Sequence, residues 1–257
     1  MIWMRKKQLV WLMFFLLIVC SGCSSEQQVK DKVITVSAAA SLKDALHEIG
    51  EHFEKENPQI EVRFNFGASG SLSEQIKQGA PVDVFLSASE EKFQELVGKD
   101  LIDKKATLVS NEIVLIATSE TALNLEELSD ITNEEIEKIS IGTPSIVPAG
   151  TYAQQALEYY GVWQDIQDKI VYAKDVRQVT TYVETGNVQV GIVYKTDAMA
   201  SDKVEIFATI DAKSHDAITY PAGVLKSSKN KEESLLFFDY LQNDAMEKVW
   251  EQYGFSL

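Results

Sequence analysis

Short apolar strands alternate with amphipathic helical segments along most of this chain. Between 33 and 98, β-branched or apolar runs at 33–37, 60–66 and 82–87 are each followed by a segment whose apolar residues recur every three or four positions. That spacing predicts a strand and then a helix, three times in succession. A chain that alternates in this way folds as an α/β protein, with helices packed on the faces of mainly parallel sheets.

The same alternation continues in the second half without any repeat of sequence. The helices expected in the first half lie at 42–53, 72–79 and 90–98; further strands lie at 113–117, 139–142, 170–172, 190–194, 204–210 and 217–225, and further helices at 151–160, 176–185, 235–241 and 246–250. Gly161 and Gly186 follow two of these helices, as C-terminal caps do. The length suits two lobes. We expect lobe 1 to comprise 33–111 and 212–257, and lobe 2 to comprise 112–211.

The N-terminal segment has the pattern of a bacterial signal peptide. Three basic residues at 5–7 precede an apolar run at 9–20, which is too short to span a bilayer as a helix. Small residues then precede Cys23, and this order resembles a lipoprotein signal, in which the cysteine after the cleavage position carries the lipid. We expect a signal peptide at 1–22, lipidation of Cys23 and a flexible tether at 23–32. A disulfide or metal pair is the alternative, but no other cysteine or nearby histidine completes such a site.

The charge of the chain limits its partners. The formal net charge is −15 and becomes −18 without 1–22, which carries three positive and no negative charges. Such an acidic protein is a poor ligand for nucleic acid. A small anion is not excluded, because a desolvated pocket lined with N–H dipoles can override a distant, screened surface charge. We expect an extracytoplasmic monomer that is held at the cell membrane by its lipid.

Three glycine-rich or hydroxyl-rich segments lie where helices should begin. They are AAASLKD at 38–44, FGASGSL at 66–72 and VPAGTYA at 147–153, and KDVR at 174–177 is a fourth strand-to-helix loop. Each alone is an ordinary helix N-cap. In α/β sheets, however, such loops converge beyond the carboxyl ends of the strands, where ligands bind. Unpaired N–H groups at several helix starts therefore suggest a small anion held by neutral donors.

Eight segments, in order along the chain, carry a resemblance to a known family. They are VSAAASLKDAL (36–46), FGASGSL (66–72), GAPVDVFLSAS (79–89), VPAGTYA (147–153), KDVRQV (174–179), GIVYKTDA (191–198), YPAGVL (220–225) and YGF (253–255). Together they resemble the molybdate-binding proteins of bacterial molybdate importers, which are type II periplasmic binding proteins. The resemblance implies two α/β lobes with a ligand cleft between them, no cofactor, and delivery of the ligand to a membrane permease with an ATP-hydrolysing subunit.

The resemblance also implies a set of ligand-binding residues. The oxyanion contacts of the family fall on Ser41, Ser69, Ala149, Val176 and Tyr194. The two serines would each give a hydroxyl and a backbone N–H, the alanine and the valine a backbone N–H, and the tyrosine its phenol. All are neutral donors to molybdate, and tungstate, which matches it in charge and size, should bind as well. Hydrogen bonds to an ionised acceptor are about twice as strong as neutral ones, so several can offset the desolvation of the anion.

One other residue, Arg177, and two other ligands have to be weighed. Arg177 follows Val176, but on a helix it points away from its neighbour, so we expect a structural partner such as Asp175. Sulfate is a smaller oxyanion, and fixed donors discriminate against it by cavity size. Phosphate carries a proton at neutral pH, which needs an acceptor that the five contacts lack. Both remain alternatives to molybdate.

An enzyme is the rival class of function. Ser69 lies in GASGS, but Gly70 follows it directly, so the spacing of a G-x-S-x-G nucleophile elbow fails. The three histidines, His47, His52 and His215, show no pattern of an orienting carboxylate or a second metal ligand. A hydrolase is therefore disfavoured, and we predict no catalytic residues and no metal site apart from the molybdenum of the bound oxyanion.

Overall fold

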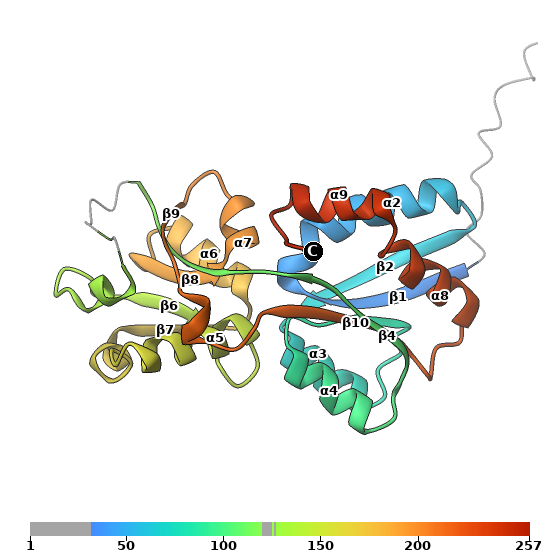
Figure 1. The fold of residues 1–257 in the computed structure, drawn as a ribbon, viewed down its shortest axis with the longest axis horizontal. Helices are drawn as coiled ribbons and strands as arrows, with labels where there is room; N and C mark the ends of the chain where they lie inside the picture. The colour runs from blue at the N-terminus through green and yellow to red at the C-terminus, as the bar shows by residue number, and fades with distance from the viewer. Residues whose placement is uncertain (1–31, 120–124, 126) are drawn as a thin grey trace, which may run out of the picture.

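The chain forms two lobes, each built around a five-stranded sheet (Figure 1). The computed structural model describes residues 32–119, 125 and 127–257. The predicted signal peptide, Cys23 and all of the predicted tether except Lys32 lie outside the described residues. Among the helices that are described, none is long and apolar enough to cross a membrane.

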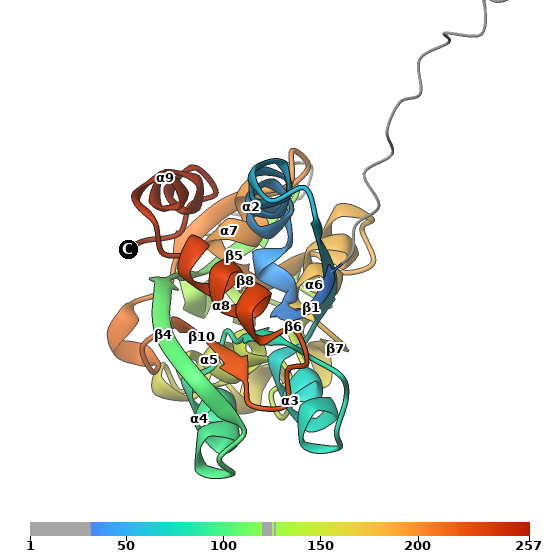
Figure 2. The same ribbon diagram turned by 90° about the vertical axis from the view of Figure 1, so that its right-hand side faces the viewer.

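Lobe 1 contains a sheet in the order β2-β1-β3-β10-β4 with helices on both faces (Figure 2). Its strands are β1 (Lys32–Ala39), β2 (Ile60–Gly67), β3 (Val84–Leu86), β4 (Ile102–Ser110) and β10 (Thr219–Leu225). Its helices are α2 (Lys43–Glu56), α8 (Lys231–Tyr240) and α9 (Asp244–Gln252) on one face, and α3 (Ser69–Lys77) and α4 (Glu90–Gly98) on the other. Successive side chains of β3 pack on opposite faces of the sheet. Phe85 stacks on Phe93 of α4, whereas Val84 and Leu86 belong to the hydrophobic core on the α2 side.

Lobe 2 has a sheet in the order β7-β6-β8-β5-β9. Its strands are β5 (Ile113–Ala117), β6 (Ile139–Gly142), β7 (Ile170–Ala173), β8 (Val190–Tyr194) and β9 (Glu205–Thr209). Its helices are α5 (Pro148–Tyr159) on one face, and α6 (Val176–Glu184) and α7 (Lys195–Met199) on the other. Four short 3-10 turns complete the described chain: η1 (Ala40–Leu42) in lobe 1, η2 (Leu128–Thr132) and η3 (Gln164–Lys169) in lobe 2, and η4 (Ala212–Ser214) between β9 and β10.

Each sheet mixes parallel and antiparallel strands evenly, although the sequence pattern predicts mainly parallel sheets. In lobe 1, β1 runs parallel to β2 and β3, whereas β10 runs antiparallel to β3 and β4. In lobe 2, β6 runs parallel to β7 and β8, whereas β5 runs antiparallel to β8 and β9. The inserted strands, β5 and β10, are those with which the chain enters a lobe after crossing from the other one. The crossings therefore account for the antiparallel pairs.

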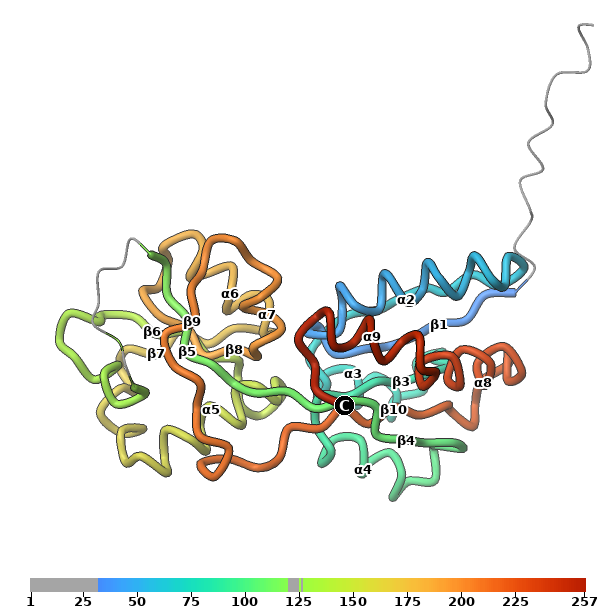
Figure 3. Tube along the Cα trace, turned by 45° about the horizontal axis from the view of Figure 1, so that its top comes forward, coloured from blue at the N-terminus to red at the C-terminus, as the bar shows by residue number. Residues whose placement is uncertain are grey.

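Two segments connect the lobes, one between β4 and β5 and one between β9 and β10 (Figure 3). They are joined by a hydrogen bond of 3.2 Å from the N–H of Asn111 to the carbonyl oxygen of Ile218. The C-terminal end of the chain lies beside them, because Ser110 and Ser256 exchange two backbone hydrogen bonds of 2.7 and 3.0 Å. The crossing region is thus a small hydrogen-bonded unit formed by three separate parts of the chain.

Candidate anion-binding site between the lobes

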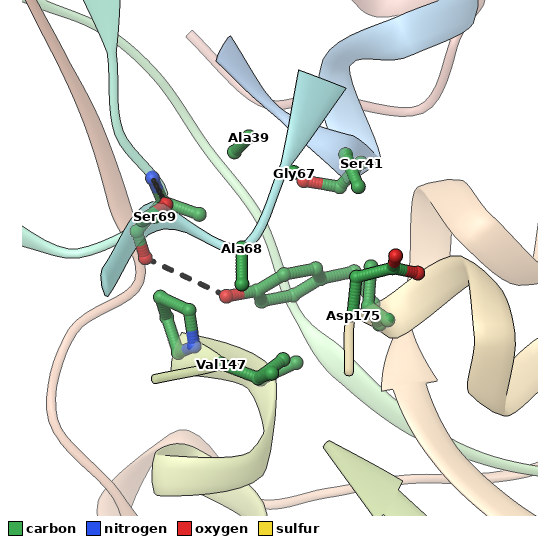
Figure 4. A pocket seen from close by; sticks show the side chains of 13 residues that line it. Ala39, Ser41, Gly67, Ala68, Ser69, Val147 and Asp175 are labelled. Carbon is green, nitrogen blue, oxygen red and sulfur yellow. Dashed lines mark hydrogen bonds between the residues drawn. The ribbon is translucent and has the colours of Figure 1, made fainter. Parts of the chain in front are cut away.

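A small pocket lies between the lobes, where four helix starts face one another (Figure 4). Its volume is about 10 Å³, against about 240 and 160 Å³ for two other pockets of the described chain. A space of this size suits a small ion. The lining residues are Ala39, Ala40, Ser41, Gly67, Ala68, Ser69, Ala88, Val147, Pro148, Ala149, Asp175, Val176 and Tyr194. All five residues that the sequence resemblance implies as oxyanion contacts are among them.

Ser41 lies in η1, the turn that leads from β1 into α2. Its side chain is buried, and its Oγ lies 3.0 Å from the phenol oxygen of Tyr220 on β10. The first N–H groups of a helix have no carbonyl partner in that helix. Ser41 therefore brings a hydroxyl and a backbone N–H to the same edge of the pocket.

Ser69 is the first residue of α3 and is fully buried. Its Oγ accepts a hydrogen bond of 2.9 Å from the N–H of Ala88, so its own hydrogen is free to point elsewhere. The helix begins three residues before the predicted start at 72. This early start places the N–H of Ser69 in the first turn of α3, where no carbonyl of the helix can accept it.

Ala149 is the second residue of α5, which begins at Pro148. Proline has no N–H, and the N–H groups of Gly150 and Thr151 both donate to the carbonyl oxygen of Val147. Ala149 thus carries the N–H of this turn that has no acceptor within the helix. Helix α5 can reach this position because Gly150 lies against Gly142 of β6: a Cβ at Gly150 would be 1.9 Å from the carbonyl oxygen of Gly142.

Val176 is the first residue of α6, and Asp175 is its N-cap. The Asp175 carboxylate accepts a hydrogen bond of 2.9 Å from the N–H of Gln178. In Figure 4 it lies on the far side of the pocket from Ser69. Because this carboxylate is engaged in capping, the N–H of Val176 is left in the first turn without an intrahelical acceptor.

Tyr194 ends β8 in lobe 2 and is buried. Its phenol oxygen lies 3.5 Å from the carbonyl oxygen of Ala88 in lobe 1, at the outer limit of a hydrogen bond. Burial raises the pKa of Tyr194 well above its ordinary value, so the group stays protonated and remains a donor at neutral pH. Its weakly held hydrogen can turn toward a ligand at little cost.

The chemistry of the pocket is that of an anion site without a cation. Its polar groups are helix N–H groups, two serine hydroxyls, one phenol and the carboxylate of Asp175, which is engaged in capping α6. The positive ends of four helix or turn dipoles are directed at the pocket. No lysine, arginine or histidine lines it.

Arg177 does not line the pocket, and its partner differs from the one expected. The guanidinium forms one ion pair with Asp44 of α2, in the other lobe, and a second of 2.7 Å with the fully buried Asp197 of α7. Asp175, the expected partner, caps α6 instead. The capping role of Asp175 follows from its position directly before the helix, which leaves Arg177 free to extend along α6 to other carboxylates.

Three further residues matter here that sequence reasoning did not single out. Tyr220 and Asn111 form hydrogen bonds directly behind Ser41, and Gly70 forms a backbone contact between the lobes. Tyr220 lies in the YPAGVL segment, which contributes to the family resemblance, but the resemblance implied no role for this tyrosine. No feature of the sequence indicated a role for Asn111 apart from its position at the expected lobe boundary.

Comparison with known proteins identifies what the chain is similar to. The sequence profile of a family described as bacterial extracellular solute-binding protein matches residues 34–256. A protein of Bacillus subtilis (strain 168), whose provisional name is ABC transporter substrate-binding lipoprotein YvgL, is 47% identical over 248 residues, which cover 94% of each chain. The molybdate-binding protein ModA of Haemophilus influenzae is 38% identical over 255 residues, covering 97% of this chain and 99% of its own.

A solved structure shows the same fold. The periplasmic molybdate-binding protein of Azotobacter vinelandii superposes with a TM-score of 0.78 at 22% identity, over 87% of this chain and 99% of its own. The likeness extends over both lobes, so the α/β class and the two-lobed arrangement expected from the sequence are confirmed.

Proposed function

We propose that this chain, which belongs to the family of bacterial extracellular solute-binding proteins, captures molybdate between its lobes and delivers it to an ABC importer. One observation carries the proposal: neutral hydrogen-bond donors from both lobes converge on one small, buried pocket. Relatives named as molybdate-binding proteins, at 38% identity over nearly the whole length, support this choice of oxyanion.

The proposed binding mode uses one donor set from each lobe. Ser41 and Ser69 give hydroxyl and backbone N–H groups from lobe 1. Ala149 and Val176 give backbone N–H groups, and Tyr194 its phenol, from lobe 2. Because the anion needs both sets, binding and lobe closure are coupled. We place the lobe boundaries near 111 and 211, so that the crossing segments serve as the hinge.

Other oxyanions are distinguished by size and by protonation. Tungstate matches molybdate in charge and size, and we propose that it binds too. Sulfate is smaller and would leave some of the fixed donors too distant. Hydrogenphosphate brings a proton that needs an acceptor, whereas the proposed contacts are donors. Sulfate and phosphate are therefore the alternatives that a titration must test.

A hydrolase is the alternative of a different class. Ser41 and Ser69 both bring a hydroxyl to the pocket, but no histidine lines it to act as a base, and Ser69 Oγ already accepts the N–H of Ala88. We propose that the protein binds and releases its ligand unchanged. Turnover of an ester or phosphoester by purified protein, abolished by Ser69→Ala, would contradict this.

The remaining proposals concern location and partners. Proteins of this family act outside the cytoplasm. We propose that this one is a monomer held at the cell membrane by a lipid on Cys23, and that its closed form docks on a permease with an ATP-hydrolysing subunit. The provisional name of the B. subtilis relative as a lipoprotein supports the anchor.

Calorimetric titration of the soluble body, residues 26–257, tests the central proposal. Molybdate, tungstate, sulfate and hydrogenphosphate are titrated separately at pH 8. We expect tight one-to-one binding of molybdate and tungstate, with little heat from sulfate or hydrogenphosphate. A folded sample that gives no heat with molybdate would overturn the ligand assignment, and tighter binding of sulfate would reassign the pocket to that anion.

A further inference from the structure

A chain of hydrogen bonds runs from the crossing segments to Ser41. Asn111, between β4 and β5, lies with its Nδ2 at 3.2 Å from the phenol oxygen of Tyr220, the second residue of β10. That phenol oxygen lies 3.0 Å from Ser41 Oγ. Tyr220 is fully buried and does not line the pocket, and neither does Asn111. The hydrogen bonds of these two residues reach the pocket through Ser41, while the ring of Tyr220 also packs edge-to-face on Tyr194, with 5.9 Å between the ring centroids.

A backbone N–H group determines which residue donates and which accepts along this series of hydrogen bonds. The N–H of Glu112 donates a hydrogen bond of 2.8 Å to Asn111 Oδ1, which fixes the orientation of the amide. The amide nitrogen must then face Tyr220 and Thr196, whose Oγ1 lies 2.9 Å away. Because an amide N–H can only donate, the phenol oxygen of Tyr220 accepts from Asn111.

Within hydrogen-bond distance of the phenol oxygen, Ser41 Oγ is the described oxygen to which Tyr220 can donate its hydrogen. A buried hydroxyl that donates to nothing loses free energy, and Ser41 Oγ is the oxygen within reach that carries no other described contact. Tyr220 thus donates to Ser41, and the hydrogen of Ser41 is left for the pocket. Ser69 is in the same state on the other side, since its Oγ accepts the N–H of Ala88.

We infer that Asn111 and Tyr220 are positioning residues that hold Ser41 as a donor, so that the pocket selects a fully deprotonated oxyanion over one that carries a proton. The inference rests on the proposed function and names the basis of its selectivity. The one carboxylate in the pocket lining, Asp175, already accepts the N–H of Gln178 as the cap of α6, whereas the proposed ligand contacts all donate. A ligand O–H that faces these donors stays unpaired in a desolvated site, and sites built for one hydrogen-bond pattern reject the other strongly.

Asn111→Asp should reverse the direction of the hydrogen bonds that run from residue 111 through Tyr220 to Ser41, with almost no change in side-chain shape. The carboxylate still accepts the N–H of Glu112, but its second oxygen also accepts, so Tyr220 turns to donate to Asp. Ser41 must then donate to Tyr220 and direct its lone pairs at the anion. We expect this variant to bind molybdate about 100-fold more weakly, and Tyr220→Phe, which leaves the Ser41 hydrogen free, only about three- to tenfold more weakly.

The double variant Asn111→Asp with Tyr220→Phe separates polarity from charge. Without the phenol the carboxylate no longer controls Ser41, so binding should return to within about tenfold of Tyr220→Phe alone. A double variant as weak as Asn111→Asp would mean charge repulsion or a structural defect, and would overturn the inference. So would an Asn111→Asp variant that binds like the wild type. A wild type that binds no oxyanion would overturn the proposed function itself.

Two further measurements apply even if Asn111→Asp does not fold, as judged by thermal unfolding without ligand. Tyr220→Phe should weaken molybdate binding in the wild type but not in a Ser41→Ala background, because the substitution keeps the ring and removes the hydroxyl that is hydrogen-bonded to Ser41. In competition against bound molybdate, the preference for sulfate over hydrogenphosphate, two anions of similar size, should fall about tenfold in Tyr220→Phe. Additive losses or an unchanged preference would contradict the inference.

Discussion

The backbone N–H of Gly70 donates a hydrogen bond of 3.0 Å to the carbonyl oxygen of Ile146, and this contact joins the two lobes beside the pocket. Gly70 is the second residue of α3 in lobe 1, and Ile146 precedes α5 in lobe 2. A Cβ at position 70 would lie 2.7 Å from that oxygen and 2.8 Å from the Cα of Ile146. The closed arrangement therefore requires a glycine here.

Gly70→Ala should hinder closure while leaving each lobe intact. The added methyl group meets backbone of the other lobe, which cannot yield as a flexible side chain can. We expect molybdate affinity to fall about 10- to 100-fold, for a steric cost of about 1 to 3 kcal/mol borne by the closed state. Calorimetry measures the affinity. Gly98→Ala is the control, because a Cβ there meets nothing within 4 Å; equal affinities in the two variants would refute a closure role.

The ion pair between Arg177 and Asp44 should contribute to closure more modestly. Both side chains are partly exposed, at 27% and 38%, so solvent screens the pair. Asp44→Asn should weaken molybdate binding about two- to fivefold, a loss of about 0.5 to 1 kcal/mol, and should flatten the salt dependence of the dissociation constant. Asp239→Asn, which breaks the exposed pair with Lys104 within lobe 1, is the matched control. A similar loss in both variants would contradict a specific role.

The sequence pattern predicted most strands and helices but missed β4. Its segment, IDKKATLVS, places charged residues at three successive positions, and only two of its nine residues are buried in the structure. It is recognisable as a strand only because it lies at the edge of the sheet beside β10. The mixed sheets escaped prediction for a similar reason: strand direction after a crossing depends on which lobe the chain enters, and local periodicity carries no such information.

The five candidate contacts could be predicted from the sequence because the family resemblance implies them, whereas the strand-to-helix junctions alone indicated only the loops in which four of the five lie. The residues behind these contacts, Tyr220 and Asn111, could not be predicted from the sequence. Tyr220 reads as an apolar strand position, and Asn111 as a loop polar group, and they meet Ser41 only through contacts more than 100 residues apart along the chain. Arg177 shows the same limit, since its partner Asp44 is 133 residues away.

Asp197 should make stability depend on pH. Burial raises its pKa from 3.8 to about 7, against the opposing effect of Arg177. Between about pH 4 and pH 7 the folded protein holds a proton there that the unfolded chain has released, so the unfolding free energy falls as the pH rises.

Asp197→Asn removes this contribution. The stability of the variant relative to the wild type should therefore increase from pH 4.5 to pH 8, by up to about 3 kcal/mol. Urea unfolding of both proteins at the two pH values measures the difference. Parallel pH profiles of the two proteins would show that Asp197 stays ionised throughout.

Cys23→Ala should separate location from binding. Cys23 lies outside the described residues, and its predicted role is attachment of a lipid. We expect the variant to move from the membrane fraction to the soluble extracytoplasmic fraction, with unchanged molybdate affinity, since the pocket residues lie in the folded body. Ser24→Ala is the control. A Cys23→Ala protein that remains in the membrane fraction would exclude this anchor.

Gly150→Ala tests the packing that positions Ala149. The new Cβ would approach the carbonyl oxygen of Gly142 to 1.9 Å, so α5 must move away from β6. We expect a loss of about 2 to 3 kcal/mol in the free energy of unfolding. We also expect weaker molybdate binding, because the N–H of Ala149 moves with the helix. Urea unfolding and calorimetry measure the two effects, and Gly98→Ala again controls for adding a methyl group to a helical glycine. If stability fell while affinity stayed unchanged, Ala149 would not be a ligand contact.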